Sequence, residues 1–138
     1  MIMPEAGELL APVMAIEGFR LGCLVDASTG MVLASVQSQD AAATPTAAAG
    51  AADLVHVLTL LNGKLATGEI LEDVMITFSD SFFMVRPLSS HRGLSPTVPA
   101  GRLDQEPQIL LLVIADRQRT NLAMAHRSIR DFCASFTS

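Results

Sequence analysis

Residues 108–115, QILLLVIA, form a continuous apolar run that is rich in branched side chains. A run of this length and composition is typical of a β-strand that is buried on both faces of a sheet. Helices must therefore cover both sides of the sheet that contains it. Asp116 ends the run and is expected to cap the region where the last helix begins. That helix is predicted from about Arg119 to Phe136, with its apolar residues on one stripe that packs on the sheet.

Two β-hairpins are predicted earlier in the chain. Residues 19–26 and 31–37 alternate as strands, joined by a tight turn that ends in a glycine and that Asp26 is expected to stabilise. Residues 70–78 and 82–88 form the second pair of strands. With the two hairpins arranged around the last strand, we expect an α/β domain with a central five-stranded, mostly antiparallel sheet.

The N-terminal residues 1–18 are predicted to form a short helix on the same face of the sheet as the last helix. Pro12 conflicts with a continuous helix, because proline removes a backbone hydrogen bond and clashes with the preceding turn. The helix is therefore either kinked or begins near Pro12. The expected order of elements is α-β-β-α-β-β-β-α, with helices on both faces of the sheet.

A longer helix, predicted from about Thr46 to Gly68, occupies the middle of the chain and is expected to cover the other face. Its central apolar stripe consists of Leu54, Leu58, Leu61 and Leu65. With Val55, Val57 and Leu60 at its flanks, the apolar arc spans roughly 220°, whereas a surface helix needs a stripe only somewhat wider than about 100°. Something must cover the excess. We favour a partner protein over loops of the same chain.

The composition limits the classes of protein to which the chain can belong. Its 138 residues fit a single domain, 1–138, with a core of about 5–136 and a long flexible loop at 89–107. The net charge of −5 and the absence of Trp and Tyr argue against nucleic-acid binding. No apolar run approaches the ~20 residues of a membrane span. No basic, apolar leader is evident, so a cytoplasmic location without membrane insertion is expected.

We find no sequence pattern for catalysis, for a cofactor or for a metal. The histidines His56, His91 and His126 show no metal-ligand spacing, either with each other or with the two cysteines, Cys23 and Cys133. Both cysteines lie among apolar neighbours and are expected to be buried thiols. A phosphate-binding loop of the P-loop kind is also absent. The sequence therefore predicts a protein that is not an enzyme.

Four stretches of the chain together resemble the Roadblock family of dynein light chains, which is related to longin and profilin-like folds. GCLVDASTGMVLASV (22–36) is similar to the opening hairpin of that family, and AAGAADLVHVLTLLNGKL (48–65) to its alanine-rich middle helix. EDVMITFSDSFFMVRPL (72–88) is similar to its second hairpin. ILLLVIADRQRTNLAMAHRSIRDF (109–132) is similar to its last strand and helix. The resemblance covers residues 18–134.

This resemblance implies a homodimer that forms through the middle helix and the third strand. The contact residues would be Leu54, Val57, Leu58, Leu61, Val74, Met75, Ile76 and Thr77. It also implies a small Ras-like GTPase as partner, and sometimes a histidine-kinase-like protein. The candidate partner-binding residues are Asp53, His56, Leu60 and Lys64. The function expected is that of a dimeric regulator or scaffold in bacterial signalling. The alternatives are a small-ligand sensor and a purely structural subunit of a larger complex.

Overall fold

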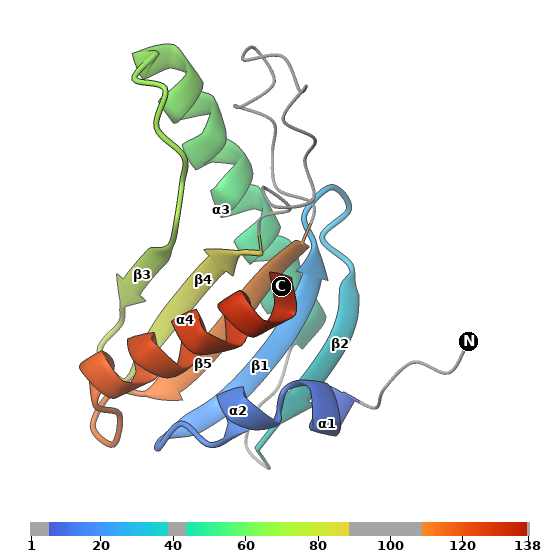
Figure 1. The fold of residues 1–138 in the computed structure, drawn as a ribbon, viewed down its shortest axis with the longest axis vertical. Coiled ribbons are helices and arrows are strands. Elements are labelled where there is room, and N and C mark those ends of the chain that lie inside the picture. Colours follow the sequence, from blue (N-terminus) through green and yellow to red (C-terminus); the bar gives the residue numbers. More distant parts are fainter. Residues whose placement is uncertain (1–5, 39–43, 89–108, 138) are drawn as a thin grey trace.

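The computed structural model describes residues 6–38, 44–88 and 109–137, with side chains described as far as Ser135 (Figure 1). The predicted loop at 89–107 lies outside these residues. The elements in chain order are α1 (Ala6–Leu9), α2 (Ala11–Met14), β1 (Phe19–Asp26), β2 (Val32–Gln37), α3 (Thr44–Leu65), β3 (Val74–Thr77), β4 (Ser81–Pro87), β5 (Ile109–Asp116) and α4 (Leu122–Thr137).

The five strands form one antiparallel sheet in the order β2-β1-β5-β4-β3. The apolar run 109–116 lies in the middle, where Leu111 pairs with Leu24 of β1 and Leu112 pairs with Val85 of β4. This arrangement confirms the predicted α/β class with a central last strand. It also leaves β2 and β3 as the two edges of the sheet.

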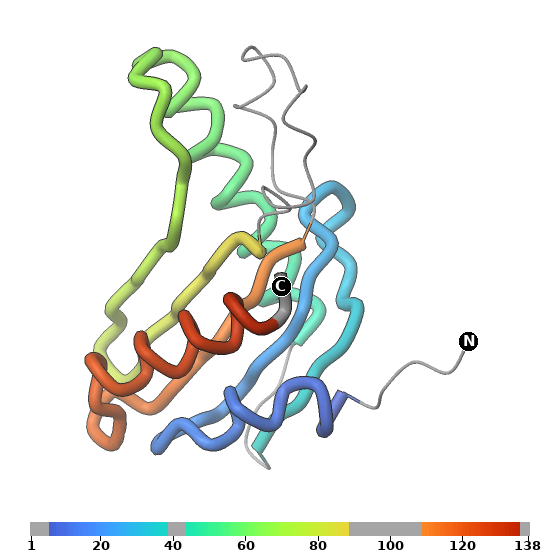
Figure 2. The backbone as a smooth tube through the Cα atoms, in the orientation of Figure 1, coloured from blue at the N-terminus to red at the C-terminus, as the bar shows by residue number. Residues whose placement is uncertain are grey.

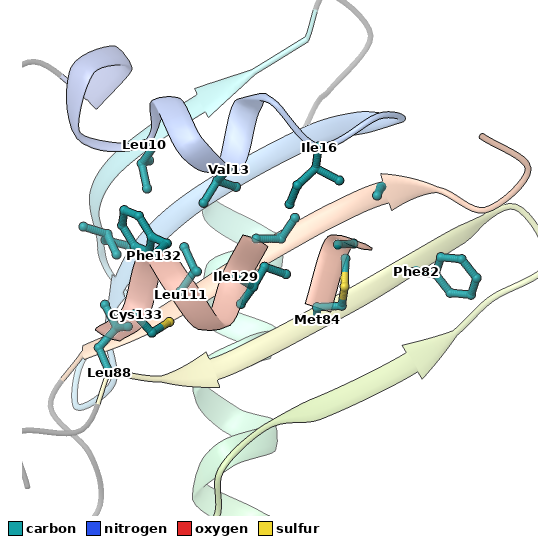
Figure 3. Close-up of a cluster of buried hydrophobic side chains, with 14 residues drawn as sticks. Leu10, Val13, Ile16, Phe82, Met84, Leu88, Leu111, Ile129, Phe132 and Cys133 are labelled. Carbon is teal, nitrogen blue, oxygen red and sulfur yellow. The ribbon is translucent and has the colours of Figure 1, made fainter. Parts of the chain in front are cut away.

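Helices cover both faces of the sheet, as predicted. On one face, α1, α2 and α4 pack over side chains such as Leu111 and Val113, and Figure 3 shows Leu10, Val13, Ile129 and Phe132 converging there. On the other face, Leu110 and Leu112 pack beneath α3. Successive residues of β5 therefore enter opposite cores. This alternation explains why the whole strand is apolar.

The first predicted helix is two short helices. Pro12 lies in the first turn of α2, where its missing N–H needs no partner, and Leu10 separates α2 from α1.

The turn after β1 forms as predicted: Asp26 Oδ1 accepts hydrogen bonds from the backbone N–H and hydroxyl of Ser28, at 2.9 and 2.6 Å. These hydrogen bonds lower the pKa of Asp26.

Two other predictions were wrong. The third strand was predicted over 70–78, but β3 spans only Val74–Thr77. Residues 72 and 73 would continue the ladder opposite Pro87 and Arg86, and Pro87 has no N–H to donate. The helix cap was assigned to Asp116, which instead accepts a hydrogen bond from the Gln118 N–H within a turn. Asn121 caps α4, because its Oδ1 accepts the Met124 N–H at 3.2 Å.

Candidate functional site

The N-terminal half of α3 anchors this helix to the sheet. Its buried residues are Ala48, Ala51, Ala52 and Val55, and they pack on the face formed by β1, β2 and β5. The small alanine side chains let the helix approach closely. At the turn before β2, a Cβ added to Gly30 would lie 3.2 Å from the Cα of Ala49. The first half of the helix is therefore part of the core.

The C-terminal half of α3 extends away from the sheet (Figure 2). Its apolar side chains are exposed. The exposed fractions are 59% for Val57, 53% for Leu60, 51% for Leu61 and 63% for Leu65. Leu54 and Leu58 are half-buried. The predicted excess of apolar surface therefore lies in one half of the helix, and no described residue of the chain covers it.

Helix α3 is also long and apolar enough to cross a membrane, judged by length and composition only. The prediction that no segment approaches that length was therefore too strict. The core helices of many globular proteins pass the same test, and four residues of α3 are buried in the fold. This finding is weak evidence for a membrane span.

Strand β3 is a free edge of the sheet. It pairs with β4 alone, so the backbone groups on its other side have no strand partner among the described residues. Along it, Val74 and Ile76 are half-buried and Met75 and Thr77 are exposed. Just beyond it, the rings of Phe78 and Phe83 pack edge to face with their centroids 4.8 Å apart. An exposed apolar edge of this kind is suited to pairing with another chain.

An open groove of about 710 Å³ joins these two surfaces. One wall is the α3 face that carries Leu58, Leu61 and Leu65, and the other is the segment 68–73 that leads into β3. At its closed end, Asn62 accepts a hydrogen bond from the Thr67 hydroxyl at 3.2 Å and donates one to the Glu69 carbonyl. The groove is thus lined by Leu58 and Leu61 of the predicted dimer interface and ends at Asp73, the residue before β3.

Sequence reasoning missed half of this groove. Ile70 and Leu71 supply its second apolar wall, and Glu69 and Glu72 bring acidic side chains to it. Ile70, Leu71 and Glu72 belong to the strand predicted over 70–78, where alternate side chains would point away from one another. The glycine at 68, which has a φ of +77°, was the available signal that the chain turns before the strand begins.

The four predicted partner-binding residues lie on another side of α3. Asp53, His56, Leu60 and Lys64 are all exposed. At 100° per residue they fall within about 80° of one another around the helix. They lie on the opposite side from Leu58, which faces the groove. Leu58 is therefore well separated from the predicted partner-binding residues, whereas Val57, another predicted dimer residue, lies only about 20° from Lys64 around the helix.

The described residues contain no group of three His, Cys, Asp or Glu side chains that could hold a metal ion. His91 lies outside them. Cys23 and Cys133 are buried and unoxidised, as predicted. Burial raises the pKa of the Cys23 thiol to about 12 and that of Cys133 to about 11. Neither thiol is therefore a nucleophile near neutral pH.

Taken together, these features define the class of molecule: an α/β domain with a free sheet edge and a partly uncovered central helix. No protein-family model and no curated protein matches the sequence. Solved structures do match the fold.

A Roadblock/LC7 domain from Streptomyces avermitilis is 15% identical, with a TM-score of 0.72, and the match covers 96% of this chain and 94% of that one. An MglB structure with a tetrameric arrangement is 17% identical, with a TM-score of 0.72 and coverage of 96% and 85%. The gliding protein MglB from Thermus thermophilus is 16% identical, with a TM-score of 0.71 and the same coverage. The chain therefore has the fold of Roadblock/LC7 domain proteins.

Proposed function

We propose that this chain is a non-enzymatic regulator or scaffold that forms a homodimer and binds a small Ras-like GTPase in the cytoplasm. One observation carries the proposal: the uncovered half of α3 lines a groove whose other wall leads directly into the free edge of β3. A second copy placed there satisfies the unpaired backbone of β3 and buries the exposed leucines of α3 in one contact.

A twofold axis beside β3 suits this geometry. In a symmetric dimer the same patch serves both subunits, so β3 pairs with its own copy and the two sheets become continuous. The exposed side chains Val57, Leu61 and Met75 then leave water. Each such side chain contributes roughly 1.5–3 kcal/mol when it is fully buried. The MglB structure with a tetrameric arrangement shows that a chain with this fold can self-associate.

The GTPase is proposed from the resemblance to the Roadblock family, because many of its members bind Ras-like GTPases across their paired middle helices. The residues proposed for this contact are Asp53, His56, Leu60 and Lys64. Because they lie on the side of α3 away from the groove, both contacts can exist at once. The chain would supply no chemistry of its own and would act by holding or reshaping the GTPase.

A pair of leucine variants tests the two contacts separately. Leu61→Asp places a charge in the proposed dimer contact, and we expect sedimentation equilibrium to show a self-association constant weakened at least about tenfold. Leu60→Asp is the matched control, because Leu60 is equally exposed and lies one residue away. It should leave the dimer intact. A natural chain that stays monomeric at roughly 100 μM would contradict the proposal.

The GTPase contact is tested by capture of the tagged protein from its native lysate, with GDP or a non-hydrolysable GTP analogue present. We expect a Ras-like GTPase to co-purify with the natural chain and to be lost with Leu60→Asp. If the GTPase co-purifies with both the natural chain and the Leu60→Asp variant, the contact does not lie on the proposed face of α3. If only the chain itself is recovered, that result contradicts the proposed GTPase contact and favours the role of a structural subunit.

The groove itself favours one alternative function, that of a small-ligand sensor. Its volume of about 710 Å³ falls within the range of ligand-binding pockets. A sensor of this kind would stay folded as a monomer and would gain thermal stability from a metabolite. A dimer would instead gain thermal stability as the protein concentration rises. Thermal unfolding of the natural chain at several protein concentrations, with and without a metabolite library, separates the two functions.

A further inference from the structure

The side chain of Asp73 joins three elements that lie far apart in the sequence. Its Oδ2 atom lies 3.4 Å from the guanidinium of Arg86 on β4 and 3.1 Å from Nε2 of His126 on α4. Arg86 also lies close enough to the buried Cys133 of α4 to act on its thiol electrostatically. The proposed GTPase contact does not use this cluster, and of its members only Asp73 lines the groove of the proposed dimer contact.

The position of Asp73 gives the cluster its significance. Asp73 immediately precedes Val74, the first residue of β3, and follows a segment at 67–72 that has no regular secondary structure. Strand β3 has four residues and a single strand neighbour. Helix α3, which packs mainly on β1, β2 and β5, gives it little support. A strand this short at the edge of a sheet would fray unless its ends were held.

Both ends of β3 are held by side chains. At its far end, the guanidinium of Arg117 donates to the carbonyl of Phe78 at 3.2 Å, and the backbone N–H of Arg117 donates to the carbonyl of Asp80. At its near end, the Asp73 carboxylate pairs with side chains of two other elements. The near end therefore depends on a polar cluster that includes α4.

We propose that Asp73 is a positioning residue that, through Arg86 and His126, fixes the start of β3 in the register needed for pairing with a second copy. The order of the β3 edge then depends on α4, which packs on the face of the sheet opposite to α3. The positioning of β3 is independent of the proposed dimer. Only its consequence for self-association rests on the proposed function.

Amide hydrogen exchange tests the positioning directly. It is measured in the Leu61→Asp background, so that self-association does not protect the strand. Asp73→Asn should speed the exchange of the 74–77 amides about two- to fivefold, the range set by partly exposed ion pairs. The amides of Leu111 and Val113 in β5 should not change. Glu72→Gln is the matched control, because it removes the same charge one residue away.

Variants of His126 separate positioning from simple packing. His126→Ala should speed exchange in β3 in the same direction, and His126→Gln should restore it, because the glutamine amide nitrogen can donate from nearly the same place as Nε2. Unchanged β3 exchange in Asp73→Asn, or equal acceleration in β5, would overturn the proposal. Failure of His126→Gln to restore exchange would also overturn it.

The consequence for assembly is measured in the otherwise natural chain. We expect His126→Ala to weaken self-association about two- to fivefold and His126→Gln to restore it, because His126, unlike Asp73 and Glu72, does not line the groove. Faster β3 exchange with an unaltered association constant would overturn the link to pairing. If the natural chain proves monomeric, the proposed function fails, and the exchange experiment still decides whether Asp73 positions β3.

Discussion

The two halves of α3 are almost equally apolar and have opposite environments. In the first half, Ala48 and Val55 are buried against the sheet, whereas in the second half Val57 and Leu61 are exposed. Helix α4 shows the usual solution, because Ile129 and Phe132 are buried while the basic residues face water. The difference teaches that the apolar residues of one helix can serve the fold or, as we propose for the second half of α3, a partner. Only the position along α3 separates them.

The sharpest test of this comparison is a pair of aspartate substitutions two residues apart. Val55 is 1% exposed, so Val55→Asp buries an unpaired charge and should lower the free energy of unfolding by about 3 kcal/mol or more. Val57→Asp places the same charge in water and should change it by less than about 0.5 kcal/mol. Urea denaturation at low protein concentration measures both. Equal losses would mean that both halves of α3 belong to the core.

The second test concerns the close contact that holds the first half. Gly30 has a φ of +75°, and an added Cβ would meet the backbone of Ala49. Gly30→Ala should therefore cost about 1–2 kcal/mol of stability. Gly50→Ala is the control, because nothing lies within 4 Å of the added Cβ and alanine favours the helix. It should stabilise the protein by about 0.5–1 kcal/mol. A stabilising Gly30→Ala would contradict the close approach.

A third test probes α4, the conventional helix in the comparison. Asn121→Ala removes the side-chain oxygen that caps α4 and should cost about 1 kcal/mol in urea denaturation. Asn121→Asp keeps a capping oxygen and should retain most of the stability. Asp116→Asn is the further control, because Asp116 does not cap the helix. If Asp116→Asn lowers the stability more than Asn121→Ala does, Asp116 caps the helix, as the sequence suggested.

The smallest effect concerns Cys23, which packs in the cluster beneath the first half of α3. Burial raises the pKa of this thiol to about 12, so folding favours its protonated form. The resulting stability is fully present below the pKa of the unfolded thiol, near 9, and is lost as the pH rises from there toward 12. Between roughly pH 8 and 9.5 the loss should stay below about 1 kcal/mol. Cys23→Ala should show a flatter dependence on pH. If the pH dependence of stability is the same in Cys23→Ala, another titrating group causes it.

The sequence was sufficient for the fold because its strongest signals are local. The apolar run 109–115 specifies a strand buried on both faces, and the glycine turn after Asp26 specifies a hairpin. The wide apolar arc of α3 likewise revealed the uncovered surface. The expected GTPase, the cytoplasmic location and the absence of enzymatic activity remain predictions.

What the sequence could not supply depends on contacts between distant residues. The ladder between β3 and β4 stops near Pro87, and this pairing is set by the sheet, whereas periodicity alone suggested a strand from 70 to 78. Asp73 and His126 are 53 residues apart, and neither carries a local signal of the other. The wall of the groove formed by Ile70 and Leu71 was missed for the same reason. It exists only because the segment 68–73 folds back along α3.

The central position of β5 has a consequence for how the protein is made. The β1–β2 and β3–β4 hairpins do not pair with each other, and both pair through a strand that begins at Ile109. During synthesis, the ribosome must therefore release the chain as far as Asp116 before the two hairpins share a common partner. Until then each hairpin is a nascent two-stranded unit with an exposed apolar face, and such units are marginally stable in water. Folding of the domain consequently waits until β5 has been made, and until then the unfinished chain is open to chaperones.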